Sequence, residues 1–297
     1  LVERLRQACD SDNPYFVSPA YAMGDRRSES ALLAYRDGGE QISLASYEQI
    51  GATYGAAFDP RRGLVYVSAY HKRGTPFGPG GPGMIYRLDL ASGAVEPWLD
   101  VPEAGAVNHD PTQNYIPDRP ARSWPGMTSL GDIDLSDDGT ELFVSNLFTR
   151  RILRYRTADR QLLSAFDFGA ARLSWGQSEG RPFALKPWRG KLYHDGSRPR
   201  VVLNFKLDYY RGLIPPNIRA NWLPWRPDTD TVAPARTHDH AYIYPMPMLT
   251  DIEFGDDGAM VLGLRDRIGD MSLYDRNRNL PAGERSGHPF GDILLCL

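Results

Sequence analysis

The sequence predicts an all-β fold, specifically a β-propeller of five or six blades. The first observation behind this prediction is the count of 29 glycines and 24 prolines among 297 residues, which favours many turns and few long helices. The second is the 16 tyrosines, with many valines, isoleucines and phenylalanines, which favour strands. The third is a strand–turn–strand unit that recurs along the chain.

The recurring unit is clearest in residues 131–146, GDIDLSDDGTELFVSN, and 250–264, TDIEFGDDGAMVLGL. In the first copy, apolar Ile133 and Leu135 alternate with acidic residues at the period of two that is typical of a strand. The Ser-Asp-Asp-Gly that follows has the composition of a tight turn. Each copy therefore predicts a β-hairpin.

Looser copies begin at residues 55 and 183 and near the N-terminus, and a sixth unit has room in 213–245. The unit at 183 includes RVVLNFKLD, at 200–208, as an expected strand. Sandwiches and jelly rolls do not predict recurring units of this kind, whereas propellers do. We therefore expect one domain over residues 1–297.

The two terminal units each lack one strand of a full blade. Pairing of the N- and C-terminal strands would complete one blade and close the ring, which also removes exposed strand edges. Such closure would bring Cys9 towards Cys296, the two cysteines of the chain, and a disulfide there would close a very long loop. In a cytosolic protein the alternative is two unrelated buried thiols.

Three long loops interrupt the strand pattern, at 71–83, 101–127 and 209–248. The last two exceed the usual length of a structureless loop in a compact domain. Loops of this length on a rigid scaffold are commonly functional, and the alternative is that they are packing arms that cover the faces of the ring.

The charge and hydropathy pattern excludes some partners. The net charge is −3 and no basic stripe is present, so we expect no nucleic-acid partner. No apolar run approaches the roughly 20 residues of a membrane helix, so we expect no membrane span. The first ten residues, LVERLRQACD, do not have the pattern of a signal peptide. The absence of a signal peptide here does not argue against export.

Several motifs appear in the same order as in a known group of propellers. They include GPGGPGMIY at 78–86, RPFALKPWRGKLY at 181–193 and DIEFGDDGAMVLGLRDRIGD at 251–270, and GDILLC closes the series. Over residues 15–297 the chain resembles the propeller region of large bacterial surface proteins that also carry SdrD-B-like or Cna-B-type repeats. The resemblance implies an exported bacterial protein that carries other domains. It supplies no catalytic residues.

The segment DLSDDGTELFVSN also resembles, more weakly, the strand–turn–strand unit of calcium-dependent propellers of the SMP-30/gluconolactonase type. That likeness implies a metal-dependent hydrolase. The unit is generic to propellers, and the chain has Asn146 where those enzymes tend to place an Asp.

The doubled acids Asp132, Asp134, Asp251 and Glu253 are the candidate metal ligands. If inner strands line a central channel, carboxylates from different blades would converge there on Ca²⁺. The alternative is that each acid caps backbone N–H groups of a neighbouring blade or pairs with an arginine. The turn acids that follow them read as turn residues.

Two loop motifs are candidate ligand-binding sites. His71, Lys72 and Arg73 precede a glycine-rich stretch, 74–83, whose backbone N–H groups and adjacent cations would suit an anion. The stretch is not a phosphate-binding P-loop, since no Gly-Lys-Ser/Thr follows, and its alternative role is a rigid connection. His238 and His240 alternate as strand residues that share a face, which suits a metal only with a third ligand.

The loop aromatics Trp124, Trp222 and Trp225, with Arg226, are candidate contacts for sugars or proteins. If they are buried, they would instead plug the ring.

We therefore predict a non-catalytic extracellular or cell-surface propeller that binds protein or glycan and uses no cofactor. The alternative is a Ca²⁺-dependent hydrolase of the lactonase type with the metal in the central channel. The first hypothesis predicts a channel closed by salt bridges, and the second predicts an open mouth with converging oxygens. No GxSxG nucleophile motif is present.

Overall fold

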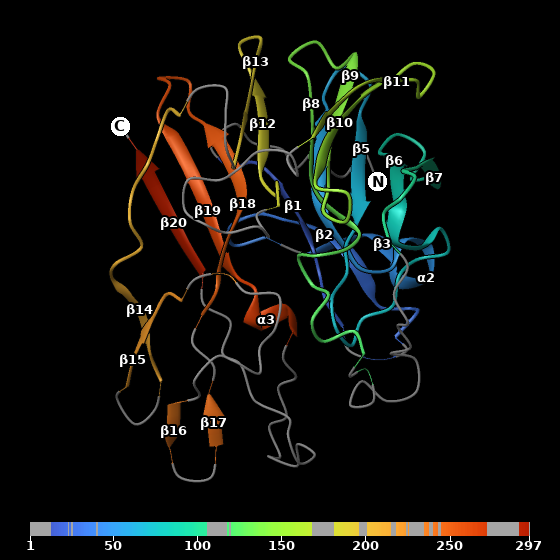
Figure 1. Ribbon diagram of the computed structural model, residues 1–297. Coiled ribbons are helices and arrows are strands. Elements are labelled where there is room, and N and C mark those ends of the chain that lie inside the picture. Colours follow the sequence, from blue (N-terminus) through green and yellow to red (C-terminus); the bar gives the residue numbers. More distant parts are fainter. Residues whose placement is uncertain are drawn as a thin grey trace.

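The computed structural model describes most of the chain, and its regular structure is almost entirely antiparallel β-sheet (Figure 1). The described residues are 13–22, 24, 26–39, 41–105, 118, 120–167, 181–195, 201–214, 218–223, 225, 235–237, 240–242, 245–271 and 291–296. None of the described helices is long and apolar enough to cross a membrane.

Two sheets have four strands that follow one another in chain order. The first contains β4 (Thr53–Asp59), β5 (Leu64–Ala69), β6 (Met84–Asp89) and β7 (Val95–Asp100). The second contains β8 (Leu130–Leu135), β9 (Glu141–Asn146), β10 (Arg151–Arg156) and β11 (Leu162–Asp167). The hairpin predicted for the first copy of the repeat is confirmed as β8–β9, with Gly139 at a φ of 70° in its turn.

The sheets at the two ends of the chain have three strands each. They are β1 (Phe16–Pro19), β2 (Ser30–Tyr35) and β3 (Ile42–Ser46), and β18 (Pro247–Phe254), β19 (Met260–Asp266) and β20 (Gly291–Cys296). Hairpin β18–β19 is the second predicted copy, and it is confirmed. Among the described strand pairs, β1 pairs with β2 and β20 pairs with β19, and no pair joins the two end sheets. Ring closure by the terminal strands therefore stays a prediction.

Three two-stranded hairpins lie between these sheets in the sequence. They are β12 (Leu185–Trp188) with β13 (Lys191–His194), β14 (Tyr210–Ile214) with β15 (Ile218–Asn221), and β16 (Ala235–Thr237) with β17 (His240–Tyr242). The strand expected at 200–208 was wrong: residues 201–208 form no strand, and most of them are exposed. Three short helical turns complete the described elements: α2 (Tyr47–Ile50), α3 (Ile268–Met271) and a 3-10 turn at Gly81–Gly83.

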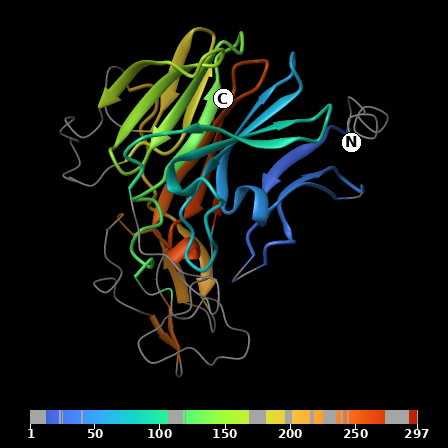
Figure 2. The same cartoon turned by 90° about the vertical axis from the view of Figure 1, so that its right-hand side faces the viewer.

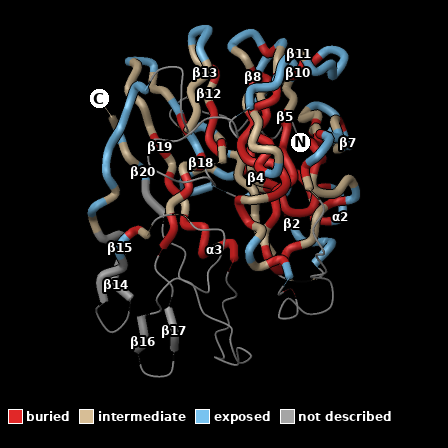
Figure 3. The backbone as a smooth tube through the Cα atoms, in the orientation of Figure 1, coloured by how far each residue is buried: buried red, intermediate tan, exposed pale blue. Residues whose placement is uncertain are grey.

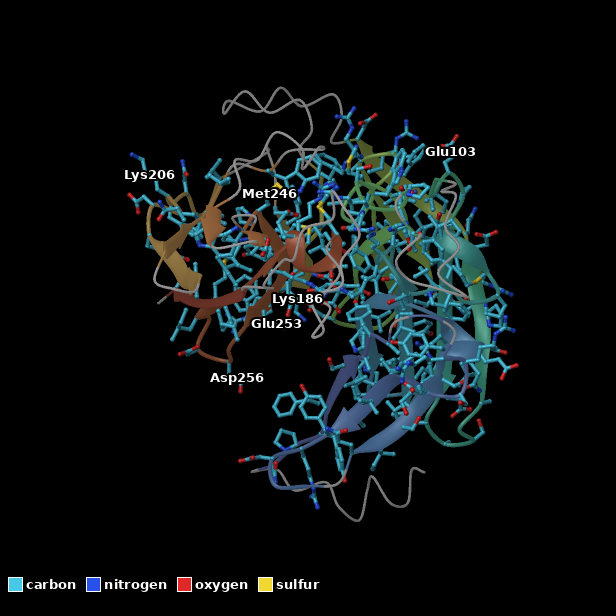
Figure 4. All side chains as sticks on the ribbon, turned by 90° about the horizontal axis from the view of Figure 1, so that it is seen from below. Glu103, Lys186, Lys206, Met246, Glu253 and Asp256 are labelled. Atoms are coloured by element: carbon cyan, nitrogen blue, oxygen red, sulfur yellow. The ribbon has the colours of Figure 1, made fainter. Side chains whose placement is uncertain are left out.

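The first strands of successive sheets lie side by side. β4 packs against β8, β8 against β12, and β12 against β18, while β1 packs against β4. The sheets consequently stand at successive angles (Figure 2) and follow an arc when the molecule is seen from below (Figure 4). This all-β arrangement of repeated antiparallel sheets is as predicted, whereas a closed propeller and its blade number remain predictions.

Apolar side chains fill the spaces between neighbouring sheets. Figure 3 shows that much of the backbone around β2, β4 and β5 belongs to buried residues. Leu32 of β2 packs with Val67 of β5 and Tyr86 of β6, which joins the first two sheets. Tyr66 of β5 packs with Ile133 of β8, which joins the next two. Since each sheet buries a face against its neighbour, the alternating strand pattern of the sequence is satisfied.

The acidic-glycine turns of the repeat connect adjacent hairpins. Arg61, in the β4–β5 turn, donates to the backbone carbonyl of Asp138 at 2.6 Å. The Asp137 carboxylate accepts the N–H of Gly190, in the β12–β13 turn, at 3.3 Å. The turn residues of the repeat therefore hold neighbouring sheets together, which is a structural role.

Gly55 sets the distance between β4 and β8. A Cβ at this position would lie 2.6 Å from the backbone nitrogen of Ile133 and 2.8 Å from the carbonyl oxygen of Gly131. Because both obstacles are backbone atoms, we expect Gly55→Ala to lower the free energy of unfolding by about 2–4 kcal/mol in urea denaturation. Gly93→Ala, at a φ of 73° with nothing within 4 Å, should cost only about 1 kcal/mol. Equal costs for the two variants would show that the inter-sheet contact is not tight.

Candidate functional site

Side chains from three sheets, β1–β3, β4–β7 and β18–β20, meet at one place. Tyr21 follows β1, Tyr54 lies in β4, and Tyr70 follows β5. The Arg265 guanidinium, from β19, lies 5.2, 5.1 and 6.0 Å from the centres of these three rings. We call these four residues, together with Lys72 and Asp270, the central cluster.

Asp270, in α3, is the buried anion of the central cluster. Its carboxylate accepts hydrogen bonds from the Tyr70 hydroxyl at 2.7 Å and from Lys72 Nζ at 2.9 Å, and it forms an ion pair with Arg265. Burial opposes its charged form, but Arg265 and Lys72 hold the pKa of Asp270 below its ordinary value. Burial lowers the pKa of Lys72 and raises the pKa of Tyr70 well above its ordinary value. The cluster thus contains two cations and one carboxylate held in fixed geometry.

Loop 71–83 is fixed to α3 by Lys72 and Arg73. Lys72 Nζ also donates to the carbonyl of Gly269 at 3.1 Å. Arg73 donates to the carbonyls of Asp118 and Met271 at 3.0 and 3.1 Å, and the Asp118 carboxylate accepts the N–H of Gly74 at 2.7 Å. Loop 101–127 is therefore joined to the same place through Asp118.

Arg267 brings in the third loop. Its buried guanidinium donates to the carbonyls of Pro125 and Ser123 at 2.7 and 2.6 Å and lies 4.4 Å from the Trp225 ring centre. Burial lowers the pKa of Arg267 to about 9. The segment that begins α3 is itself fixed, because the Asp266 carboxylate accepts the N–H groups of Met246 and Ile268, both at 2.9 Å. Segment 265–271 therefore contacts all three long loops.

The predicted loop contacts are mostly inside the protein. His71 and Arg73 are 0% and 1% exposed, and the Lys72 side chain is 13% exposed. Trp222 is buried, while Trp124 and Trp225 are half-buried. The cations of loop 71–83 bind partners within the fold. They therefore offer little exposed surface for the predicted binding of an anion.

Some predicted residues cannot be placed. Arg226 and His238 lie outside the described residues, as does Cys9. His240 begins β17. Cys296 is a half-buried free thiol, and its pairing with Cys9 stays a prediction.

The doubled acids gather around one lysine, where β8, β12 and β18 meet. Lys186 Nζ lies 2.8 Å from a carboxylate oxygen of Asp134 and 2.9 Å from one of Glu253, and Figure 4 shows Lys186 and Glu253 together at the centre. Asp132 accepts the N–H of Leu185 at 3.1 Å, across the gap between two sheets, and that of Ile133 at 2.9 Å. These are the backbone capping and cation pairing that form the alternative to metal binding, with Lys in place of Arg.

The pKa values of Asp132, Asp134, Asp251 and Lys186 at this junction are raised above their ordinary values. Burial, then the charge of Asp251, raises the pKa of Asp132 well above its ordinary value. The loss of hydrating water and then the negative charge of Glu253 raise the pKa of Asp251 to about 6. Burial opposes the charge of Lys186, but Asp134 and Glu253 hold its pKa above the ordinary value. Proton affinity is thus high where the two copies of the repeat meet.

Ligand geometry for a metal is not seen in the described part of the chain, which holds no group of three or more His, Cys, Asp or Glu side chains placed to bind one ion. Asn146, at the position where lactonase-type enzymes tend to have Asp, caps a turn. Its amide oxygen accepts the N–H groups of Phe148 and Thr149, both at 3.0 Å. Calcium binding by the doubled acids therefore stays a prediction.

Sequence reasoning missed the role of segment 265–271. Its signal was present in RDRIGD, at 265–270, in which two arginines and two aspartates occur within six residues directly after the apolar run of a predicted strand. Charged residues beside a buried strand point to internal ion pairs, because burial of an unpaired charge is costly.

Comparisons with known proteins give distant relatives only. No protein-family model matches the chain. Colossin-A of Dictyostelium discoideum is 26% identical over 272 residues, which cover 78% of this chain and 2% of that protein. Colossin-D of the same organism is 23% identical, over 77% of this chain and 26% of that protein. The chain therefore spans about a quarter or less of these curated relatives, and they do not bear on the predicted bacterial origin.

Similar solved structures are remote. The hydrazine synthase of Kuenenia stuttgartiensis has a TM-score of 0.38 and 12% identity, covering 91% of this chain and 57% of that one. An auxiliary nutrient binding protein from Bacteroides thetaiotaomicron has a TM-score of 0.37 and 11% identity, covering 92% and 55%. Scores this low support no conclusion about fold or function.

Asp195 offers a pH test of the packing beside the central cluster. It accepts the N–H of Phe183, which contacts Tyr54 and Tyr70, at 2.7 Å. Packed surroundings raise the pKa of half-buried Asp195 from 3.8 to about 8. A carboxyl with a raised pKa in the folded state favours folding in acid, and this contribution is lost as pH rises from about 4 to about 8.

We therefore expect Asp195→Asn to reduce the fall in unfolding free energy between pH 5 and pH 8 by about 1 kcal/mol, allowing for the solvent that reaches this group. Denaturant titrations at several pH values measure the slope. Asp256→Asn, in an exposed turn, is the control and should leave it unchanged. A slope identical in wild type and Asp195→Asn would show that Asp195 titrates normally.

Proposed function

We propose that this chain is a non-catalytic β-propeller module, extracellular or on a cell surface, that binds protein or glycan through its long loops. The observation that carries the proposal is the attachment of all three loops to segment 265–271. Arg73, Asp118 and Trp225 come from the three loops, and each is held by the contacts described above. A rigid scaffold that gathers long loops at one place is the usual arrangement of a binding surface.

The position of α3 supports the same proposal. In Figure 1 it lies towards the end of the molecule that also carries hairpins β14–β15 and β16–β17. The third loop contains both hairpins. The loops that the sequence singled out therefore extend from one end of the sheets, and that end is where we place the binding surface.

The chemistry of the centre favours binding over catalysis. Lys186 lies between Asp134 and Glu253, and Asp270 lies between Lys72 and Arg265. Ion pairs of this kind are what the binding hypothesis expects to close a central channel, and they support the proposal. A hydrolase would instead use an open mouth with carboxylates free to hold Ca²⁺. Since the chain matches only a small part of each colossin, a module within a larger protein is consistent with the proposal.

Binding is tested with a variant that releases two loops at once. Arg267→Gln removes the ring contact with Trp225 and weakens the hold on Ser123 and Pro125. We expect the wild type to bind saturably to a member of a glycan array or a panel of cell-surface proteins. The variant should bind the same target about tenfold more weakly, because disordered loops lose preorganisation.

The matched control is Arg154→Gln, which removes an arginine from an exposed pair with Glu141 outside the loop end. It should bind as the wild type does, and circular dichroism should show unchanged strand content in both variants. Failure of the wild type to bind any target, or equal binding by Arg267→Gln, would contradict the proposal. Turnover of a lactone that depends on Ca²⁺ would favour the hydrolase instead.

A further inference from the structure

The guanidinium of Arg265 occupies a site whose walls come from other parts of the chain. Tyr21, Tyr54 and Tyr70 present their rings at 5.2, 5.1 and 6.0 Å, and Asp270 supplies a carboxylate in ion-pair contact. Aromatic faces attract a cation through the ring quadrupole, and a planar guanidinium combines stacking with charged hydrogen bonds. The wall chemistry thus suits a guanidinium cation irrespective of the chain that carries it.

The walls are held by bonds that do not involve Arg265. The Tyr21 hydroxyl donates to the carbonyl of Thr53 at 2.7 Å, and the Tyr70 hydroxyl donates to Asp270 at 2.7 Å. Tyr54 and Tyr70 both pack on Phe183, with ring centres at 4.9 and 5.8 Å. Lys72 remains beside Asp270 and over the Tyr21 ring at 5.1 Å, so the carboxylate keeps one counter-charge if Arg265 is removed. The site is therefore expected to persist when it is emptied.

The site is partly open to solvent. The Arg265 side chain keeps 27% of its surface exposed, while Asp270 is fully buried. A small cation can consequently enter without unfolding of the sheets, and the buried carboxylate can accept a charge-assisted hydrogen bond from it.

We propose that the central cluster is a guanidinium-binding site that the chain fills with its own Arg265. Arg265 acts as a tethered ligand, which fastens β19 to the segments that follow β1 and β5 and to β4. The site takes a guanidinium cation in preference to a spherical ammonium or an alkali ion, because three rings and one carboxylate match a planar donor. This inference does not depend on the binding function proposed for the loops.

The test is chemical rescue of an emptied site. Arg265→Ala should lower Tm by about 5–10 °C, because a buried carboxylate loses one of its two cations. Guanidinium chloride at about 20 mM, far below denaturing concentrations, should restore about half of that loss. Sodium chloride and tetramethylammonium chloride at equal ionic strength should restore much less. A saturable change in the tyrosine ultraviolet difference spectrum should accompany the rescue.

The control is Arg154→Ala. Arg154 also combines a carboxylate, that of Glu141, with an aromatic ring, that of Phe143 at 6.0 Å, but on an exposed surface. Guanidinium should not stabilise this variant or the wild type. If Arg265→Ala does not fold, Arg265→Gln takes its place in the same comparison. A guanidinium effect no larger than that of sodium, or equal in the Arg154 variant, would overturn the proposal.

Discussion

The arrangement of this protein depends on the burial of one carboxylate, that of Asp270. A buried carboxylate is tolerated only when cations and hydrogen-bond donors surround it. One of its partners, Lys72, lies 198 positions away in the sequence, and another, Arg265, comes from the neighbouring strand. The pairing of this charge therefore brings the last sheet against the segments that follow strands β1 and β5. The ring of tyrosines around Arg265 adds to the same constraint.

The same constraint positions the loops. Once Asp270 fixes α3, Arg267 on one side and the carbonyl of Met271 on the other are available to the loops beside them. The packed sheets supply stiffness, while segment 265–271 decides where the loops leave the scaffold. A substitution of Asp270 would thus change the contacts of the loops, although Asp270 lies outside all three of them.

The sequence was informative wherever local rules decide the structure. The alternation of Ile133 and Leu135 with acids, and the Asp-Gly turn after them, predicted β8–β9, and the same pattern predicted β18–β19. Period and turn chemistry are local properties, so a single chain reveals them. The strand expected at 200–208 had the right local pattern and still failed, because a strand also needs a partner along its edge.

The candidate site was harder to predict because its partners are distant in the sequence. The residues around Lys186 in the sequence do not indicate that it pairs with Asp134 and Glu253, which lie on two other sheets. The His71–Arg73 segment suggested an exposed anion site, yet Arg73 is buried among carbonyl oxygens. The packing of whole sheets determines which cation pairs with which carboxylate. Local sequence composition therefore does not predict these pairs.

Native-state hydrogen exchange of Asp270→Asn tests the central claim most directly. If Asp270 holds the last sheet to the rest of the molecule, amides of β18, β19 and residues 70–75 should lose protection together. Amides of β8–β11 should remain close to wild type, because the sheet they form is packed through separate apolar contacts. Uniform loss over all sheets, or no loss around α3, would contradict the account.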